Sequence, residues 1–587
     1  MEPGNKKYLF SEMMKKLKNY DPKNWTDISL SLADIKENAP PVERFSRDEF
    51  FEKVRAGMAF WTFDLGIDGV SIEISKYAQC LYDILSDEKK AVIHYISGDF
   101  HPQADNIIKP EWKKHRISGA NGWSKWDRGI WFEKLFYQDM KENSKISHKM
   151  AVEIWNQAVC LAKKLGTYIA ENEISLLIPV NVNSNPGNMA TGLCTILVSE
   201  LMGLYVLNSN HDFYWEGGRP ASERKQDEEP GPRDKFFHNI NNVPFFSLLK
   251  KIYPWNGRRW IQVNINALQS KKLICDNGFS RDRIFEVSTS VSKAFFKYYS
   301  KKDIESVRLR TAHILSDGNP LIRTIAVRSH LHDLKKWMTR QKPLVCSSRS
   351  GRSLDLTSDQ IIYFLQPTRI VGRKRIEKDL HLIGALLKYP PFLNEFEKNK
   401  GQQIILHITG PVPIEHRVDL ENILRTYIDV VSQVPENIAG RLFLAFSVGV
   451  DGHTSFQDKN FKQLKIEDIY RLATAVLFPS ETEGRGLPII ESSAAGIPII
   501  CSRYRPTEIF DSVVGKDLPE DQQIHYIPFP EEDFSESFLG EITGLLSDPK
   551  KREQYKKHNT RAVRQRYSTE VMRKNFCKYL DELLNTK

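Results

Sequence analysis

Residues 475–503 read AVLFPSETEGRGLPIIESSAAGIPIICSR, and their pattern indicates the class of fold. The first four residues are apolar, and they predict a buried strand that ends at Pro479. After a short loop, the apolar pattern from Leu487 predicts a helix, and Gly496 is a suitable C-cap for it. A second apolar strand follows directly. A strand, a helix and a strand in this order predict parallel pairing in a layered α/β domain.

The loop between this strand and this helix has the composition of an anion site. The first N–H groups of a helix have no partner within it, and the helix dipole is positive at that end. Gly484 and Gly486 would let the backbone approach an anion without a Cβ in the way. Glu483 precedes the helix and Glu491 follows eight residues later, so the two carboxylates suit different hydroxyl groups. We expect a pyrophosphate here; an ordinary turn with acids that complement the dipole is the alternative.

The same alternation extends through both halves of the chain. In the second half the expected strands are 361–365, 403–409, 442–446, 475–478 and 498–502, and the expected helices are 377–387, 418–433, 466–473 and 488–495. In the first half the expected strands are 59–62, 91–96, 174–182, 204–207, 260–263 and 284–287, and the expected helices are 71–85, 148–171 and 189–201. Two consecutive doubly wound units predict a bilobed enzyme that binds its ligands at strand carboxyl ends, in a cleft between the lobes.

Four segments follow from this pattern. They are a helical preface over 1–45, a Rossmann-like acceptor domain over 46–338, a Rossmann-like donor domain over 339–566 and a helix over 567–587 that packs back on the N-terminal domain. A polar loop rich in Gly, Pro and charge interrupts the first domain near 216–234. The boundary between the halves is placed at the Ser-rich stretch 342–359 or just before it.

Composition narrows the class of protein. The chain has 587 residues, of which 41% are hydrophobic and 27% are charged, as in globular proteins. Its formal charge of +10 fits anionic ligands such as nucleotides or sugar phosphates and does not require nucleic acid. The seven cysteines are scattered without metal or CxxC spacing. With no secretory signal and no long apolar run, we expect a cytoplasmic protein with reduced thiols.

Two basic helices leave alternatives open. Lysines interrupt the apolar positions of the preface, and the stretch 549–567 carries eight cations against one acid, Glu553. Each could be a helix with a solvated basic face or a surface for anionic lipid. Peripheral membrane contact is the less favoured of these interpretations.

The segment around Glu483 and Glu491 resembles the E-x7-E signature of retaining glycosyltransferases of the family 4 type. That resemblance implies the GT-B architecture, in which two Rossmann-like domains face each other across a cleft. It also implies that Glu483 contacts the transferred sugar and Glu491 the ribose of the nucleotide. The backbone from Gly484 through Arg485 and Gly486 to Leu487 would cradle the donor. Arg485 stands where the family usually has an aromatic residue.

Further stretches share the resemblance. After the strand at 361–365 come Arg369 and Lys374, which match the family's pair of cations on the donor diphosphate. Cations there would stabilise the charge that builds on the leaving group. His407-Ile-Thr-Gly-Pro resembles a strand and glycine beside the nucleotide, which makes Gly410 a donor-binding candidate.

The first half gives a weaker match. His211, after the strand at 204–207, matches a histidine that meets the sugar near its reacting carbon. Gly66 and Gly69 resemble the family's glycine loop after the first strand, and we expect them to contact the donor. Asp212 and Asn185 also follow expected strands, and we expect both to bind the acceptor.

The resemblance implies transfer of a hexose, with retention, from a nucleotide-diphosphate sugar to a hydroxyl acceptor. UDP-glucose is the first donor to consider and GDP-mannose the second; the acceptor is expected to be a small sugar, a sugar phosphate or a glycerate-like acid. No D-x-D motif lies at an expected strand end, so we expect neither an essential metal nor another cofactor. A GT-B nucleotide-sugar epimerase and a non-catalytic nucleotide-sugar binding protein are the alternatives.

Overall fold

The computed structural model divides the chain into two compact units. Unit 1 comprises Met1–Thr289 and Met572–Lys587, and unit 2 comprises Ser290–Val571. The structure describes residues 5–41, 45–66, 69–122, 135–136, 138–216, 234, 236–287, 289–316, 322–327, 343–410, 417–447, 462 and 464–586. Most of the expected loop at 216–234 lies outside these residues.

Unit 1 is built on a seven-stranded sheet in the order β3-β2-β1-β4-β5-β6-β7, and every neighbouring pair is parallel. Its strands are β1 (Met58–Leu65), β2 (Ile93–Phe100), β3 (Lys113–Arg116), β4 (Leu176–Pro179), β5 (Tyr205–Asn210), β6 (Trp260–Asn264) and β7 (Ile284–Glu286). The chain winds outward from β1 in one direction and from β4 in the other. This is the Rossmann strand order, and its switch point lies between β1 and β4.

Helices cover both faces of this sheet. They are α1 (Lys6–Leu17), α2 (Trp25–Glu37), α3 (Arg47–Ala56), α4 (Gly69–Leu85), α6 (Lys145–Glu171), α7 (Met189–Leu201), α9 (Val243–Ile252) and α10 (Ala267–Cys275). Side chains that alternate along β1 explain the two layers. Ala59 and Trp61 face a core shared with α6 and α7, whereas Met58 and Phe60 face a core shared with α3 and α4.

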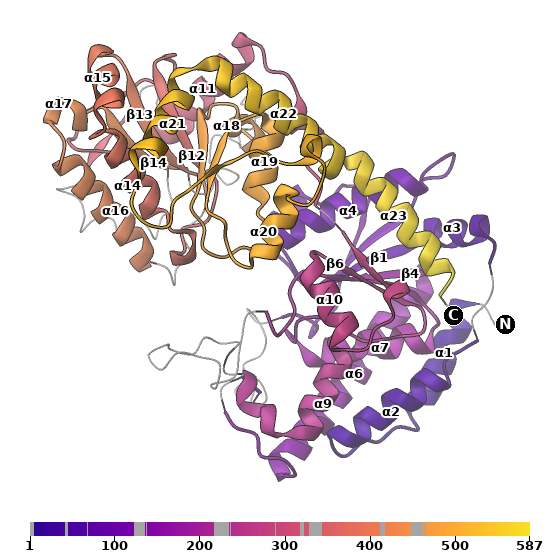
Figure 1. The fold of residues 1–587 in the computed structure, drawn as a ribbon. Coiled ribbons are helices and arrows are strands. Elements are labelled where there is room, and N and C mark those ends of the chain that lie inside the picture. The colour runs from indigo at the N-terminus through magenta and orange to yellow at the C-terminus, as the bar shows by residue number, and fades with distance from the viewer. Residues whose placement is uncertain are drawn as a thin grey trace. The chain divides into compact units, whose positions relative to one another are not determined.

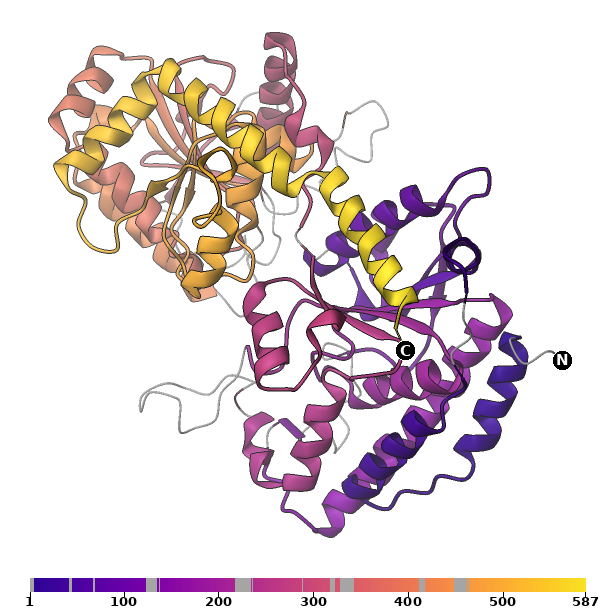
Figure 2. The same cartoon turned by 45° about the vertical axis from the view of Figure 1, so that its right-hand side comes forward.

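The N-terminal helices dock on this unit. Met13 and Leu17 of α1 are buried in the core that contains α6 and α7, and Figure 2 shows the indigo helices α1 and α2 beside the other helices of the unit. The described helices include none whose length and apolar character would let it span a bilayer.

The last helix, α23 (Thr569–Leu584), returns to unit 1. Phe576 and Tyr579 are buried there, and the ring of Phe576 lies 5.3 Å from that of Tyr77 on α4. Figure 1 shows α23, in yellow, near α4. Unit 1 therefore needs both ends of the chain to complete its core.

Unit 2 repeats the Rossmann order in an eight-stranded sheet, β17-β16-β15-β12-β13-β14-β10-β9. Its strands are β9 (Ile325–Ala326), β10 (Leu344–Ser347), β12 (Ile361–Gln366), β13 (Gln403–Ile408), β14 (Leu442–Phe446), β15 (Ala475–Phe478), β16 (Ile499–Cys501) and β17 (Ile527–Pro528). All neighbouring pairs are parallel except β10 with β14. A separate two-stranded ribbon joins β8 (Ile322–Arg323) to β11 (Ser353–Leu354).

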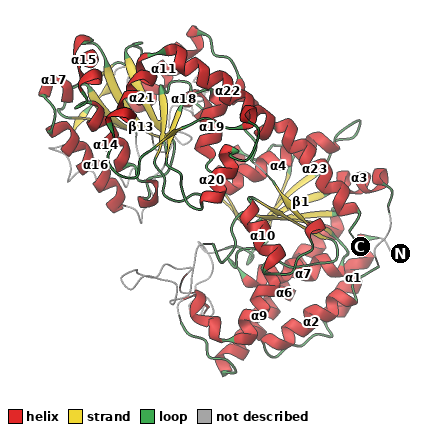
Figure 3. Ribbon diagram, viewed as in Figure 1, coloured by secondary structure: helices red, strands yellow, loops and turns green. Residues whose placement is uncertain are grey.

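The helices of unit 2 also form two layers. They are α11 (Lys301–Leu315), α14 (Glu377–Leu386), α15 (Pro390–Lys398), α16 (Arg417–Ser432), α17 (Glu436–Ala439), α18 (Ile466–Tyr470), α19 (Leu487–Ala495), α20 (Thr507–Val514), α21 (Glu536–Ser547) and α22 (Pro549–Tyr567). Figures 1 and 3 show the strands of this unit between α14 with α16 and α19 with α22.

The expected boundary at 339 falls inside unit 2, whose first residue is Ser290. The Ser-rich stretch at 342–359, where the boundary between the halves is expected, contains β10 and β11. Leu344 and Val345 of β10 pair with Phe446 and Ala445 of β14, so backbone hydrogen bonds tie this stretch to the second sheet. Helix α11 precedes it and also belongs to unit 2.

Removing one aromatic side chain from α23 tests its role in unit 1. Phe576→Ala is expected to lower the free energy of unfolding of unit 1 by about 3–5 kcal/mol, because it opens a cavity in a buried aromatic cluster. Lys574→Ala on the exposed side of the same helix is the control and should change it by less than about 0.5 kcal/mol. Denaturant unfolding followed by tryptophan fluorescence measures both. Equal effects would contradict the packing of α23.

Candidate functional site

The candidate site lies at the switch point of unit 2. Strands β12 and β15 are neighbours at the centre of the sheet, yet the chain leaves them toward opposite edges. The loop after β12 carries Arg369 and Lys374, and the loop after β15 carries Glu483. In open parallel sheets, such a divergence at the carboxyl ends of two strands leaves room for a ligand.

A buried ion pair joins the two loops. The Lys374 ammonium donates to Oε1 of Glu483, and the two side chains are only 9% and 11% exposed. The more exposed Arg373 places its guanidinium 3.9 Å from the other carboxylate oxygen. Backbone bonds strengthen the junction, because Glu481 N–H donates to the Arg373 carbonyl and the Arg373 guanidinium donates to the Thr482 carbonyl.

The charges in this cluster act against one another. Burial lowers the pKa of Lys374, and the cations Arg373 and Arg369 lower it further, whereas the Glu483 carboxylate raises it. Glu483 therefore helps the buried amine to keep its proton. A charged ammonium in a poorly hydrated site attracts an anion more strongly than one in water does.

Helix α19 begins beside this pair. Its N-cap is Gly486, whose φ of 61° is left-handed, and Pro488 lies in its first turn. A Cβ at Gly486 would overlap the hydroxyl group of Tyr504, so both the backbone and the packing require glycine there. The structure thus explains the second glycine of the loop.

Gly484, the first glycine of the loop, has no comparable structural constraint. A Cβ built on Gly484 meets no atom within 4 Å, and its φ lies outside the left-handed range. The protein itself does not need glycine at this position. Any requirement would have to come from a ligand lying against the loop.

Glu491 is held by a different partner. It lies on α19, and the hydroxyl of Tyr470 on α18 donates to its Oε2 at 3.0 Å. Tyr470 is fully buried, and burial together with the Glu491 carboxylate raises its pKa well above the ordinary value. The phenol stays protonated at neutral pH and fixes one oxygen of Glu491.

The other predicted donor residues of unit 2 surround this core. Arg369 is exposed, whereas Gly410 after β13 packs so closely that a Cβ would overlap the carbonyl of Thr368. Arg485 lies near enough to Tyr567 of α22 to lower the pKa that burial raises there. Leu487 is partly buried as the first residue of α19.

In unit 1, His211 and Asp212 follow β5 directly. Their N–H groups both donate to Oδ1 of Asn181, at 2.8 and 3.0 Å. Asn181 lies after β4 in the left-handed region with a φ of 59°, so it ties together the ends of two neighbouring strands. His211 itself is only 6% exposed.

The remaining predicted residues of unit 1 lie near its switch point. Gly66 directly follows β1 and its N–H donates to the Ser71 hydroxyl, while Gly69 begins α4. Asn185 is buried, and its N–H donates to the carbonyl of Asn181. Between the two glycines, residues 67 and 68 lie outside the described residues.

Sequence reasoning missed the residues that hold these candidates in place. Gln269 of α10 donates to the His211 carbonyl at 3.2 Å and to the carboxylate of Glu216 at 2.9 Å. Tyr470 and Tyr504 carried no signal at all, because their roles depend on contacts between distant segments. Asn181 carries one signal, since asparagine tolerates positive φ, but it falls inside the expected strand 174–182.

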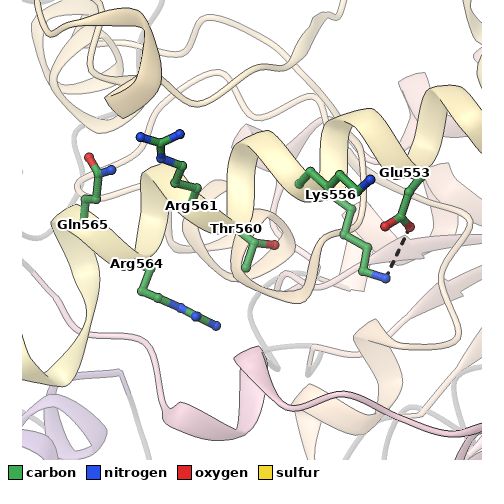
Figure 4. A pocket seen from close by; sticks show the side chains of 7 residues that line it. Glu553, Lys556, Thr560, Arg561, Arg564 and Gln565 are labelled. Atoms are coloured by element: carbon green, nitrogen blue, oxygen red, sulfur yellow. Dashed lines mark hydrogen bonds and ion pairs between the residues drawn. The ribbon is translucent and has the colours of Figure 1, made fainter.

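A hollow on α22 is the second candidate site. The described residues that line it are Glu553, Lys556, Lys557, Thr560, Arg561, Arg564 and Gln565. Figure 4 shows them along the helix, with Glu553 paired to Lys556 at 3.3 Å. This surface is basic and mostly exposed, and its described lining lacks the buried acid–cation pair of the switch point.

No group of three or more His, Cys, Asp or Glu side chains in the described residues is placed to hold a metal ion.

Residues 447–562 match the family model described as glycosyl transferases group 1. The protein is a glycosyltransferase. The matched segment contains Glu483, helix α19 and Glu491. A comparison with curated protein sequences gives no match.

Several solved structures are similar to the chain. A glycosyltransferase from Rickettsia africae is 12% identical with a TM-score of 0.49, and 90% of this chain and 99% of that one are covered. HepE from Anabaena, solved in complex with UDP and glucose, is 10% identical with a TM-score of 0.49, covering 89% and 99%. Sucrose-phosphate synthase from Thermosynechococcus elongatus is 14% identical with a TM-score of 0.48, covering 90% and 100%.

The two loop glycines give a matched test of the local structure. Gly486→Ala should lower the free energy of unfolding by about 1–3 kcal/mol, because alanine at positive φ is strained and would also collide with Tyr504. Gly484→Ala should be neutral or slightly stabilising, by up to about 1 kcal/mol, since its space is open. Chemical denaturation of both variants measures the difference. Equal losses at the two positions would contradict this geometry.

Proposed function

We propose that the protein transfers a hexose from a nucleotide-diphosphate sugar to a hydroxyl acceptor with retention of anomeric configuration. The observation that carries the proposal is the buried Lys374–Glu483 pair beside the N-terminus of α19. It combines a desolvated cation for a diphosphate with an acid for sugar hydroxyl groups. The group 1 match over residues 447–562 supports the same reaction class.

The diphosphate would be bound by charge without a metal. Lys374 supplies a point charge, the exposed Arg369 a planar fork, and the first amides of α19 a positive dipole end. These groups stabilise the negative charge that grows on the leaving diphosphate as the glycosidic bond breaks. We propose that no divalent metal is essential.

Donor binding would exchange the partner of Lys374. In the structure the Lys374 ammonium is paired with the Glu483 carboxylate. An incoming phosphate oxygen would compete with this carboxylate for the ammonium. Once displaced, Glu483 can accept hydrogen bonds from hydroxyl groups of the sugar. Glu491, fixed by Tyr470, is the proposed acceptor for the ribose hydroxyls. The proposed roles of the two acids thus agree with their different partners.

The transfer step balances without an added reagent. The bond from the anomeric carbon to the diphosphate oxygen breaks, and a bond from that carbon to the acceptor oxygen forms on the same face. The acceptor hydroxyl gives its proton to an oxygen of the departing phosphate. His211 is proposed to contact the transferred sugar, with Gly66 and Gly69 near the donor and Asn185 and Asp212 at the acceptor. The acceptor is proposed to be a small sugar, a sugar phosphate or a glycerate-like acid.

Thermal-shift screening against UDP-, GDP- and ADP-sugars, with and without EDTA, tests the proposal directly. A ligand that binds only the folded state raises the melting temperature. UDP-glucose is the first donor to screen and GDP-mannose the second. Product formation with a panel of acceptors then distinguishes transfer from epimerisation, hydrolysis or binding without turnover. A protein that none of these nucleotide sugars stabilises would refute the proposed function.

Substitution of the central cation tests its part in catalysis. Lys374→Ala is expected to lower kcat/KM by roughly 100- to 1,000-fold, the usual cost of removing one preorganised group that stabilises transition-state charge. Lys400→Ala is the control, because Lys400 is exposed at the opposite, amino-end edge of the same sheet. Initial rates with the donor found by screening measure both. Normal turnover by the Lys374 variant would exclude this residue from the reaction.

The affinity of Glu483→Gln for a nucleoside diphosphate should depend on pH in a defined direction. Because the carboxylate raises the pKa of Lys374, its removal lets burial lower that pKa further. At acid pH the variant should bind the free nucleoside diphosphate more tightly than the wild type, since the competing acid is gone. As the pH rises, its affinity should fall before that of the wild type, because Lys374 loses its proton earlier. Calorimetric titrations from acid to alkaline pH measure this crossover. Affinities that change with pH in parallel for the variant and the wild type would contradict the exchange of partners on Lys374.

A further inference from the structure

A fully buried acid lies behind the donor loop. Asp379, in the first turn of α14, has no solvent exposure, and its Oδ2 accepts a hydrogen bond from Nε2 of Gln366 at 2.8 Å. Its Oδ1 finds no hydrogen-bond partner among the described residues. Burial raises the pKa of Asp379 well above its ordinary value and so favours the neutral form of the carboxyl group.

Asp379 is the first member of a short hydrogen-bonded chain. Gln366, the last residue of β12, is also fully buried, and its Oε1 accepts from the hydroxyl of Thr368 at 3.0 Å. The amide of Gln366 thus joins Asp379 to Thr368, which directly precedes Arg369. From the other side, Gly410 packs against the backbone of Thr368 and Arg369 without room for a side chain. The turn that carries Arg369 is held on both sides.

The burial of Asp379 is unfavourable for the stability of the fold. A buried carboxyl group with one oxygen unpartnered costs free energy that an apolar side chain would not. Local choices that work against stability are most common where a site must be held in one geometry. Here the costly group is Asp379, which is hydrogen-bonded to the last residue of β12.

We propose that Asp379 is a positioning residue for donor binding. Through Gln366 and Thr368 it fixes the turn at 367–369, so that Arg369 presents its guanidinium to the diphosphate. The assignment rests on the proposed function, because it takes the diphosphate as the ligand of Arg369. Asp379 touches neither the donor nor the reacting atoms.

The test compares Asp379→Leu, Asp379→Asn and Thr368→Val. The readout is the affinity for UDP, GDP or ADP, whichever the wild type binds, measured by calorimetry. Leucine removes the acceptor of Gln366 and valine removes the hydroxyl, so each should weaken diphosphate binding about tenfold, or about 1.4 kcal/mol. Asparagine keeps an acceptor oxygen and should stay within about threefold of the wild type. KM for the acceptor should not change in any of the three.

A double-mutant cycle separates positioning from general stability. If Asp379 and Thr368 act through Arg369, neither substitution should weaken diphosphate binding further in an Arg369→Ala background. A loss of affinity that adds to that of Arg369→Ala would overturn the assignment. If Asp379→Leu does not fold, Thr368→Val carries the cycle alone, because it removes only one oxygen from a mostly buried site.

Melting curves check that the carboxyl group is neutral when folded. Above about pH 4 the unfolded chain releases the proton of Asp379 while the folded chain keeps it. Wild-type stability should therefore fall, relative to Asp379→Asn, as the pH rises from about 4 to 7. A wild type that binds no nucleoside diphosphate would refute the proposed function and this assignment together. Binding that Asp379→Leu and Thr368→Val leave unchanged would refute the assignment alone.

Discussion

The ion pair between Lys374 and Glu483 is the constraint on which the site depends. Removing two charges from water costs more than their attraction usually returns, so such a pair is weak evidence for stability. Either charge alone would be worse, because it would remain buried without compensation. The pair therefore keeps a desolvated ammonium ready between two loops that the sequence separates by 109 positions.

The sheet makes this pairing possible. Rossmann winding places β12 and β15 side by side while their connections turn toward opposite edges, so the two loops meet only at the carboxyl ends of those strands. Unit 1 applies the same rule with β1 and β4. There the loops contribute Gly66 and Asn181, and Asn181 in turn holds the backbone of His211. In each unit, one polar side chain after a central strand organises a neighbouring segment.

The sequence predicted the regular elements well because their patterns are local. Apolar runs marked β12 to β16, and the spacing of Glu483 and Glu491 placed both acids around the start of α19. Strand β3 escaped because it reads Lys-Lys-His-Arg, with three exposed side chains and no apolar pattern. Strands β9 and β11 have only two residues each, too few to show a period. Without β9 and β10, the sequence indicates a boundary between the halves at 342–359 or just before it.

The site was predicted as a set of residue types, not as a set of contacts. Arg369, Lys374, Glu483 and Glu491 were named from their motifs, but no local pattern could pair Lys374 with Glu483 or Glu491 with Tyr470. Those contacts depend on strand order and helix packing. Asp379 gave no signal in the sequence, because its burial becomes visible only when α14 lies on the sheet.

The unequal partners of the two acids have an energetic consequence for the proposed function. Glu491 accepts a hydrogen bond from the hydroxyl of Tyr470. A ligand can add further hydrogen bonds to Glu491 without breaking this one. Glu483 instead faces a cation that the diphosphate also attracts. A nucleoside diphosphate alone would displace Glu483 and leave a partly buried carboxylate without a partner. A nucleotide sugar brings hydroxyl donors for the same carboxylate. The pair would thus favour the complete donor over its product, and product release would follow as Glu483 returns to Lys374.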